Sequence, residues 1–303
     1  MPSLKEIRAR IASVASTEKI TSAMKMVAAA KLKKSEGLTT SFLPYKNKLS
    51  EALANYLGSL EEAVSIPLME KREAKKVTLI TFSSTNGLCG VYNSNIFKLF
   101  KNTYDEYAQR VGADHITVHI FGKKLNDYAK KCGIPVAQFH KSLADELTYD
   151  QTSAFSDQMV ERFLNHETDK VVMVYNHFKN AGVQTPTCET VLPLEPTVME
   201  AGKSFDYIVE PNKEEFINLL VPKVIRTKFY AIMLDTFTAE HAARMTAMHI
   251  ASDNANTLLQ ELKRQYNRAR QDVITNELID IVGGAEALSK YPSCQMVGWG
   301  TQP

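Results

Sequence analysis

The segment SSTNGLCG, residues 83–90, is where this chain could bind a phosphate group. It follows an apolar run typical of a buried strand and precedes a helical pattern, and backbone amides at a helix start bind anions. Its glycines fit only GxxG, without the GxGxxG of a dinucleotide site or the GK[ST] of a P-loop. A tight strand-to-helix turn packed against another element explains the segment better. An α/β enzyme that binds a nucleotide here remains an alternative.

Histidine and cysteine are the next candidates for chemistry. His115 and His119 lie four residues apart on one predicted strand, so they share a face and could hold a metal, although a partly exposed strand explains them as well. No Ser-His-Asp or Cys-His grouping has local support. The isolated cysteines predict neither a zinc site nor a disulfide framework, and they fit a reducing compartment. The cysteines are Cys89, Cys132, Cys188 and Cys294.

Arginines near the C-terminal end offer recognition rather than catalysis. Arg268, Arg270 and Gln271 lie on adjacent faces of a predicted helix, and arginine binds carboxylates through paired hydrogen bonds. A solvated basic face explains them equally well. An apolar helix end follows, with no core of its own to enter, so we expect another protein to hold it. Its apolar residues are Leu278, Ile281, Val282 and Leu288.

The element that carries the first basic residues is a helix over residues 1–60. Apolar residues recur there at spacings of three and four, and Ser3 with Glu6 forms a capping-box pattern that marks the helix start. Gly37 and Pro44 are expected to kink or loosen the helix, which then resumes. The apolar residues are Ile7, Ile11, Val14, Ile20, Met24 and Val27.

Residues 75–211 alternate between strand and helix patterns. KKVTLITFSS, HITVHIFG, IPVAQFH and DKVVMVYNHF are predicted strands, and TPTCETVLPLEP is the expected extended neighbour of the fourth. Strands that alternate with helices indicate an open, mostly parallel, Rossmann-like α/β sheet.

Residues 212–288 return to a helical pattern, which at full length would extend on the order of 115 Å. Because an intact domain joins the two end helices, they must run antiparallel if they pack together. Ala239, Ala243 and Ala247 form a row that permits close helix approach, and Arg244 is expected on the opposite face. The predicted fold is therefore an α/β domain plus a long antiparallel coiled coil, with a tail over residues 289–303. Such a helical pair resembles an arm or shaft; a free-standing coiled-coil scaffold is the alternative.

Charge and hydropathy exclude several classes of protein. The net charge is only +2, which argues against nucleic-acid binding by the chain as a whole. Residues 1–36 hold eight basic residues against three acidic ones, so the excess of positive charge is local. No apolar run approaches the roughly 18 residues that would cross a bilayer, and no secretion signal is recognisable. Any connection to a membrane is expected to go through partners.

Two terminal segments resemble a known family. LKEIRARIASVASTEKITSAMKMVAAAKLKKSE and ARMTAMHIASDNANTLLQELKRQYNRARQDVITNELIDIVGGAEAL are similar to the terminal signatures of the gamma subunit of F-type ATP synthases, and NGLCG followed by YNSNIFK is similar to the start of its central domain. The resemblance covers residues 3–288. It implies a noncatalytic rotor, present once per complex, whose coiled coil enters a hexamer of alternating alpha and beta subunits. It also implies contacts with the epsilon-type (mitochondrial delta) subunit and the c-ring. Cofactors, nucleic acid and direct membrane insertion are not expected.

The resemblance also assigns roles to residues. Arg10 and Ser13 match an N-terminal contact with a "catch" loop of the beta subunit, and Arg270 and Gln271 match the C-terminal catch contacts. Met24 matches the methionine beside an acidic loop of the beta subunit, a position tied to coupling. The apolar helix end matches a segment held in an apolar sleeve at the top of the hexamer.

The chain departs from the family pattern in two places. Thr85 and Asn86 stand where the family usually has Asp-Arg, which puts an ionic role of that loop in doubt, and the tail continues beyond the usual end. These departures favour a mitochondrial protein, peripheral on the matrix side of the inner membrane. The alternative is the cytoplasmic face of a bacterial plasma membrane.

Overall fold

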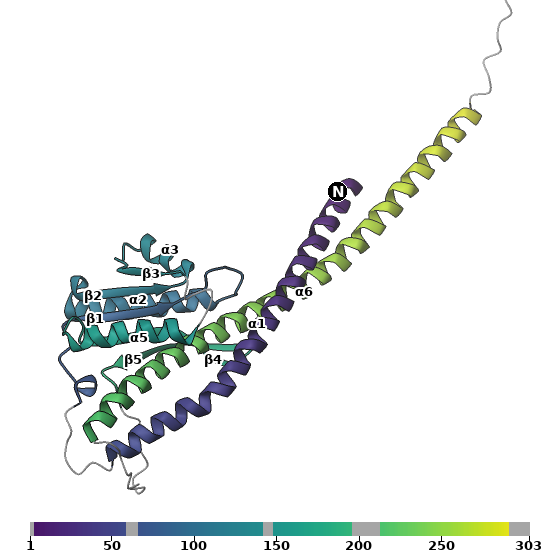
Figure 1. Cartoon of the computed structure of the whole chain (residues 1–303). Helices are drawn as coiled ribbons and strands as arrows, with labels where there is room; N and C mark the ends of the chain where they lie inside the picture. Colours follow the sequence, from purple (N-terminus) through teal and green to yellow (C-terminus); the bar gives the residue numbers. More distant parts are fainter. Residues whose placement is uncertain (1–2, 59–65, 142–147, 196–212, 291–303) are drawn as a thin grey trace, which may run out of the picture. The chain divides into compact units, whose positions relative to one another are not determined.

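The computed structural model describes residues 3–58, 66–141, 148–195 and 213–290 (Figure 1). The chain forms two compact units: a helical unit of Met1–Ser22 with Ile250–Pro303, and a sheet unit of Ala23–His249. Helices α1 (Leu4–Gly58) and α6 (Lys213–Lys290) each contribute to both units. The tail after residue 290, with Cys294, lies outside the described residues.

A five-stranded sheet in the order β3-β2-β1-β4-β5 is the centre of the sheet unit. Its strands are β1 (Val77–Phe82), β2 (Ile116–Phe121), β3 (Gln138–His140), β4 (Lys170–Asn180) and β5 (Val183–Leu192). Parallel pairing joins β3 to β2, β2 to β1 and β1 to β4, whereas β4 and β5 form an antiparallel hairpin. All side chains of β1 are buried, as expected for a strand covered on both faces. The predicted open, mostly parallel α/β sheet is confirmed.

Helices cover both faces of this sheet. On one face lie α2 (Tyr92–Val111) and α3 (Lys123–Lys131), whose Phe100 and Leu125 pack with Leu79 of β1. On the other face lie α5 (Tyr149–Leu164) and the parts of α1 and α6 in the sheet unit, whose Phe163 and Phe229 pack with Ile80. The alternation of Leu79 and Ile80 between the two clusters follows from the two-residue period of a strand. Two short 3₁₀ turns, η1 (Pro67–Met69) and η2 (Ala113–His115), connect these elements.

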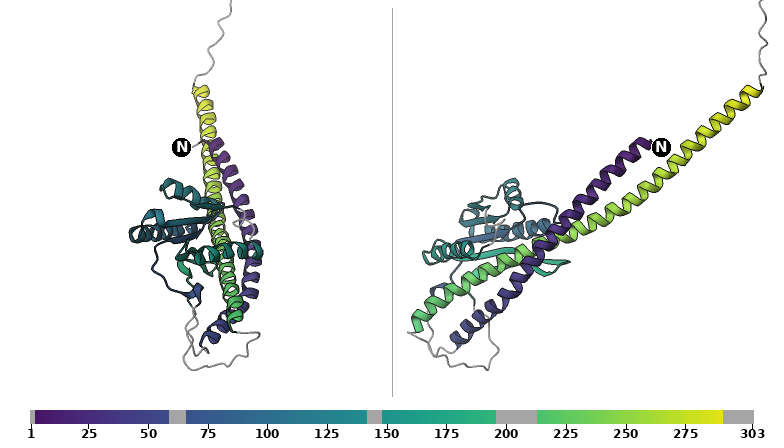
Figure 2. Two further views of the ribbon diagram at one scale, coloured as in Figure 1. Left: turned by 60° about the vertical axis from the view of Figure 1, so that its left-hand side comes forward. Right: turned by 45° about the vertical axis from the view of Figure 1, so that its right-hand side comes forward.

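The two long helices pack as an antiparallel pair in the sheet unit. In the sheet unit, Phe42 meets Tyr230 and Tyr56 meets Phe216, with ring centroids 4.8 and 4.9 Å apart. Residue numbers rise along α1 as they fall along α6 between these pairs, as antiparallel packing requires. The predicted antiparallel pairing of the end helices is therefore confirmed (Figure 2).

Within the helical unit, α1 begins at the predicted cap. The Ser3 amide donates to Glu6 Oε2 over 2.9 Å and the Glu6 amide donates to Ser3 Oγ over 3.3 Å, which confirms the capping box. Ile7 and Leu262 are buried in this unit, and Ser252 Oγ lies 3.4 Å from Glu18 Oε1.

Helix α1 is continuous through Gly37 and Pro44, the residues that the sequence predicts to kink or loosen it. Proline lacks the amide that would bond the carbonyl four residues earlier. Hydroxyl groups of the preceding turns bond carbonyls four residues back, and Phe42 packs on Tyr230. Packing against α6 therefore outweighs the unfavourable intrinsic propensity of these two residues.

Candidate functional site

The segment 83–90 forms a tight turn that packs on α6. Gly90 has φ +58°, and a Cβ added there would lie 3.6 Å from the Cβ of Ala247. The Ser84 amide donates to Asn93 Oδ1 over 3.1 Å, so this amide is already bonded and is not free for a phosphate. The geometry fits the turn interpretation rather than the nucleotide-binding alternative.

At this turn the structure extends one sequence-based expectation about α6 and contradicts another. Ala239 and Ala243 pack against Cys89 and Tyr92 of the sheet unit, so the alanine row allows close approach of this turn as well as of a helix. Arg244 was expected on an outer face, but its side chain is only 12% exposed. It donates to the carbonyl of Asn86 over 3.1 Å and to Glu240 over 2.7 Å.

The link at Asn86 could not be read from the sequence, because Arg244 lies 158 residues away along the chain and meets a backbone carbonyl. Every residue has a backbone carbonyl, so the residue type at position 86 does not indicate this contact. The loop that carries Thr85 and Asn86 is therefore attached to α6 through its backbone.

The structure does not bring His115 and His119 together. His115 ends η2 and is exposed, whereas His119 is 3% exposed on β2. His119 Nδ1 lies 3.2 Å from His140 Nε2, and His119 Nε2 lies 3.1 Å from Arg162 Nη1. Because arginine only donates, Nε2 of His119 accepts and its Nδ1 carries the proton. Among the described residues, no group of three His, Cys, Asp or Glu side chains could hold a metal ion.

Burial lowers the pKa of His119 to about 4, with smaller contributions from His140 and Arg162. In the unfolded chain this histidine takes up a proton near pH 6.5, so acid favours unfolding and stability is lost as the pH falls from 6.5 towards 4. We expect a loss of about 3 kcal/mol between pH 7 and pH 4 from this group. Urea unfolding at both pH values should show a smaller loss for His119→Leu than for the unchanged chain. An identical loss in both would contradict this role.

The residues assigned to the catch and bearing contacts lie on the two long helices. Arg10 and Ser13 are exposed on α1, and Arg270 and Gln271 are exposed on α6, all within the helical unit. Met24 is partly exposed on α1 in the sheet unit. Within the described part of the chain, no hydrogen bond or ion pair engages their side chains. They are therefore available to another protein.

The apolar end of α6 is uncovered in the helical unit. Leu278, Ile281 and Val282 are 57%, 66% and 63% exposed, whereas Leu288 lies on the helix at a position whose side chain is not described. The sequence predicted no partner contact for further exposed apolar side chains of the two long helices, although Ile20 and Val27 were recognised as part of an apolar helical pattern. These are Ile20, Met26, Val27, Ile250, Val273, Ile274 and Ile279.

No helix in the described segments is long and apolar enough to span a bilayer. The exposed functional candidates are thus helix surfaces in both units, with chemistry suited to protein contacts. They comprise arginine and glutamine donors on one hand and large apolar side chains on the other.

Comparison with known proteins agrees with this pattern. A family model described as "ATP synthase" matches residues 3–288. The ATP synthase gamma chain of Flavobacterium johnsoniae is 48% identical over 290 residues, covering 95% of this chain and 100% of the relative. That of Bacteroides fragilis is 44% identical over 292 residues, with the same coverage.

Solved structures show the same fold. A chain of the Euglena gracilis mitochondrial ATP synthase (OSCP/F1/c-ring) aligns with a TM-score of 0.63 at 17% identity, covering 98% of this chain and 99% of that one. A chain of the Tetrahymena thermophila mitochondrial ATP synthase (central stalk/c-ring) aligns with a TM-score of 0.55 at 22% identity, covering 77% and 99%. These identities show the fold alone. The sequence relatives are bacterial, so the expected mitochondrial origin has no support. Matched from residue 3 to 288 and along the whole length of its relatives, the chain belongs to the ATP synthase gamma chain family.

Proposed function

We propose that this chain is the noncatalytic central shaft of a proton-translocating F-type ATP synthase. It couples rotation of the membrane ring to conformational changes at the catalytic beta subunits, in synthesis or hydrolysis of ATP. The observation that carries the proposal is the uncovered apolar end of α6, where Leu278, Ile279, Ile281 and Val282 are 57–66% exposed. Large apolar side chains gathered on one helix end are characteristic of a surface that another protein covers.

The partners follow from the family. The proposed shaft stands once in a hexamer of alternating alpha and beta subunits and contacts an epsilon-type subunit and the c-ring. The structural neighbours, which belong to ATP synthase assemblies of F1, central stalk and c-ring, support this arrangement. The chain supplies contacts and no catalytic residue.

The shaft is proposed to contact the beta subunits in two ways. Arg10, Ser13, Arg270 and Gln271 form the catch, whose hydrogen bonds to carboxylates, about 1.5–3 kcal/mol each, form at one rotor angle and break at the next. Met24 belongs to the bearing, where apolar and flexible side chains give small barriers at every angle. Their exposure, together with the absence of side-chain bonds among the described residues, supports these roles.

The proposed location is the cytoplasmic face of a bacterial plasma membrane, as a peripheral protein. The bacterial sequence relatives favour this alternative over the mitochondrial one. Attachment to the membrane then depends on the ring that the shaft contacts.

Co-expression with the alpha and beta subunits of the same organism tests the proposal. One copy of this chain should co-purify with the hexamer, and Ile281→Asp should reduce its recovery, because removing one buried apolar side chain costs about 1.5–3 kcal/mol. Ile281→Leu should assemble normally. Asn276→Asp adds the same charge on the same helix without removing an apolar side chain, and separates the two effects. A stable homodimer that does not bind the alpha and beta subunits would instead favour a free-standing coiled-coil scaffold.

A further inference from the structure

Helix α6 contacts the rest of the sheet unit in two different ways. Between residues 217 and 233 its buried side chains, apart from Thr227, are large and apolar and belong to the main core, as with Phe229 and Met233. Between residues 235 and 247 its fully buried side chains are small or polar. These are Thr236, Thr238, Ala239, His241, Ala242 and Ala243. In this stretch α6 meets Cys89 and Tyr92 through Ala239 and Ala243, so its own side chains interlock less than those of the first stretch.

Asp235 is the first residue of that stretch, and its carboxylate makes two polar contacts with strand β4. Its Oδ1 accepts the backbone amide of Phe178 over 3.0 Å, and its Oδ2 lies 2.6 Å from Nδ1 of His177. The Asp235 side chain is only 18% exposed. A largely buried carboxylate on α6 thus binds both the main chain and a side chain of the strand.

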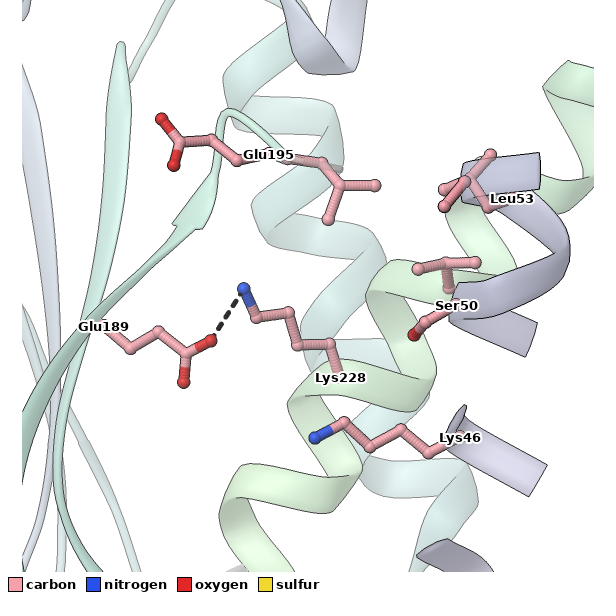
Figure 3. Close-up of a pocket in the computed structure, with 9 residues that line it drawn as sticks. Lys46, Ser50, Leu53, Glu189, Glu195 and Lys228 are labelled. Atoms are coloured by element: carbon pink, nitrogen blue, oxygen red, sulfur yellow. Dashed lines mark ion pairs between the residues drawn. The ribbon is translucent and has the colours of Figure 1, made fainter. Parts of the chain in front are cut away.

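Two further bonds reach the same β4–β5 hairpin from α6. Thr246 Oγ1 donates to the carbonyl of Ala181 over 2.9 Å, near the hairpin turn. Lys228 Nζ donates to the carbonyl of Thr190 over 3.1 Å and pairs with Glu189 over 2.8 Å, as the dashed line in Figure 3 shows. The hairpin is therefore attached to α6 at its base, along β4 and near its turn.

We propose that Asp235 is a positioning residue that carries rotational load between the β4–β5 hairpin and α6. The proposal rests on the shaft function above. Apolar contacts are non-directional, so two apolar surfaces can shift past each other at small cost. A charge-assisted hydrogen bond weakens steeply when its angle or length changes. Under torque, the bonds of Asp235 resist relative displacement where the neighbouring alanines cannot.

Single-molecule rotation of the complex tests this role. The hexamer is fixed to a surface, a bead is attached to the sheet unit, and ATP drives rotation of the complex that contains the full chain. Asp235→Leu should lower torsional stiffness, seen as a wider angular distribution of the bead in each dwell. Asp235→Asn should give a distribution between those of Asp235→Leu and the unchanged chain, because its amide oxygen still accepts the Phe178 amide but the bond is no longer charge-assisted.

Asp157→Ala is the matched control. Asp157 of α5 pairs with Arg226 of α6 over 2.6 Å, but both side chains are about 40% exposed and the pair adjoins the apolar core. An ion pair that solvent screens in this way contributes little energy, so Asp157→Ala is expected to leave the torsional stiffness unchanged. If Asp235→Leu does not assemble, Thr246→Val removes the bond near the turn and should widen the distribution in the same direction.

The outcomes separate the two proposals. Failure of the unchanged chain to rotate would overturn the shaft function itself. Rotation of the unchanged chain with equal stiffness in Asp235→Leu and Asp157→Ala would overturn the role of Asp235 alone. A lower melting temperature of Asp235→Leu that Asp235→Asn shares, with stiffness unchanged in both, would indicate a purely structural role and would also overturn it.

Discussion

Gly122→Ala is expected to lower the free energy of unfolding by about 4 kcal/mol or more, a large part of the stability of an ordinary domain. Gly122 connects β2 to α3 with φ +97°, and a Cβ added there would lie 2.0 Å from the carbonyl oxygen of Ser83. Backbone strain of about 1–3 kcal/mol and overpacking of similar or greater size add together. Denaturant unfolding monitored by circular dichroism measures the loss.

Gly122→Ala is expected to disturb more than this turn, because Ser83 is hydrogen-bonded to residues on both sides of Gly122. Its amide donates to the carbonyl of Phe121 over 2.7 Å, and its hydroxyl accepts the amide of Leu125 over 3.0 Å. A displaced Ser83 would disturb the start of the turn that packs on α6.

Gly133→Ala provides the control for this prediction. Gly133 also has a positive φ, +68°, but no atom lies within 4 Å of an added Cβ, so only backbone strain of about 1 kcal/mol is expected. Equal losses for both substitutions would show that the close contact at Gly122 does not matter.

Met24→Lys is expected to uncouple ATP hydrolysis from proton pumping in the assembled complex. The resemblance places Met24 beside an acidic loop of the beta subunit, where lysine would form an ion pair that holds one rotor angle. A charge-assisted hydrogen bond of about 1.5–3 kcal/mol adds a barrier that the flexible methionine does not impose. Membrane vesicles should retain hydrolysis while acidification of their interior falls.

Met26→Lys makes the same substitution two residues further along α1. Met26 is 63% exposed, whereas Met24 is partly buried, and two residues on a helix point about 200° apart. Hydrolysis and pumping should remain coupled in this variant. If Met24→Lys leaves hydrolysis and pumping coupled, the bearing role of Met24 is contradicted. If Met24→Lys and Met26→Lys uncouple them equally, the cause is the added charge on α1 rather than the position of Met24.

Local sequence patterns predict several structural features of this protein without any tertiary information. Ser3 and Glu6 predict the capping box because both partners lie within one helical turn. The continuous apolar run of β1 predicts a strand buried on both faces, and the long pattern without glycine predicts α6. The exposed apolar end at Leu278 and Ile281 could be anticipated, because a helix end without a partner segment has no core to enter.

Contacts between distant segments were decided only by the tertiary structure. The glycine at position 122 is required by a carbonyl 39 residues earlier, and Arg244 is largely covered where it meets the backbone of Asn86. The ring of His119 contacts His140 of the adjacent parallel strand, two residues beyond its register partner Gln138, and does not contact His115. Asp235 likewise bonds a backbone amide on β4. Spacing along the chain reports neighbours within one element, whereas backbone donors and acceptors of another element carry no residue identity, so only the fold reveals them.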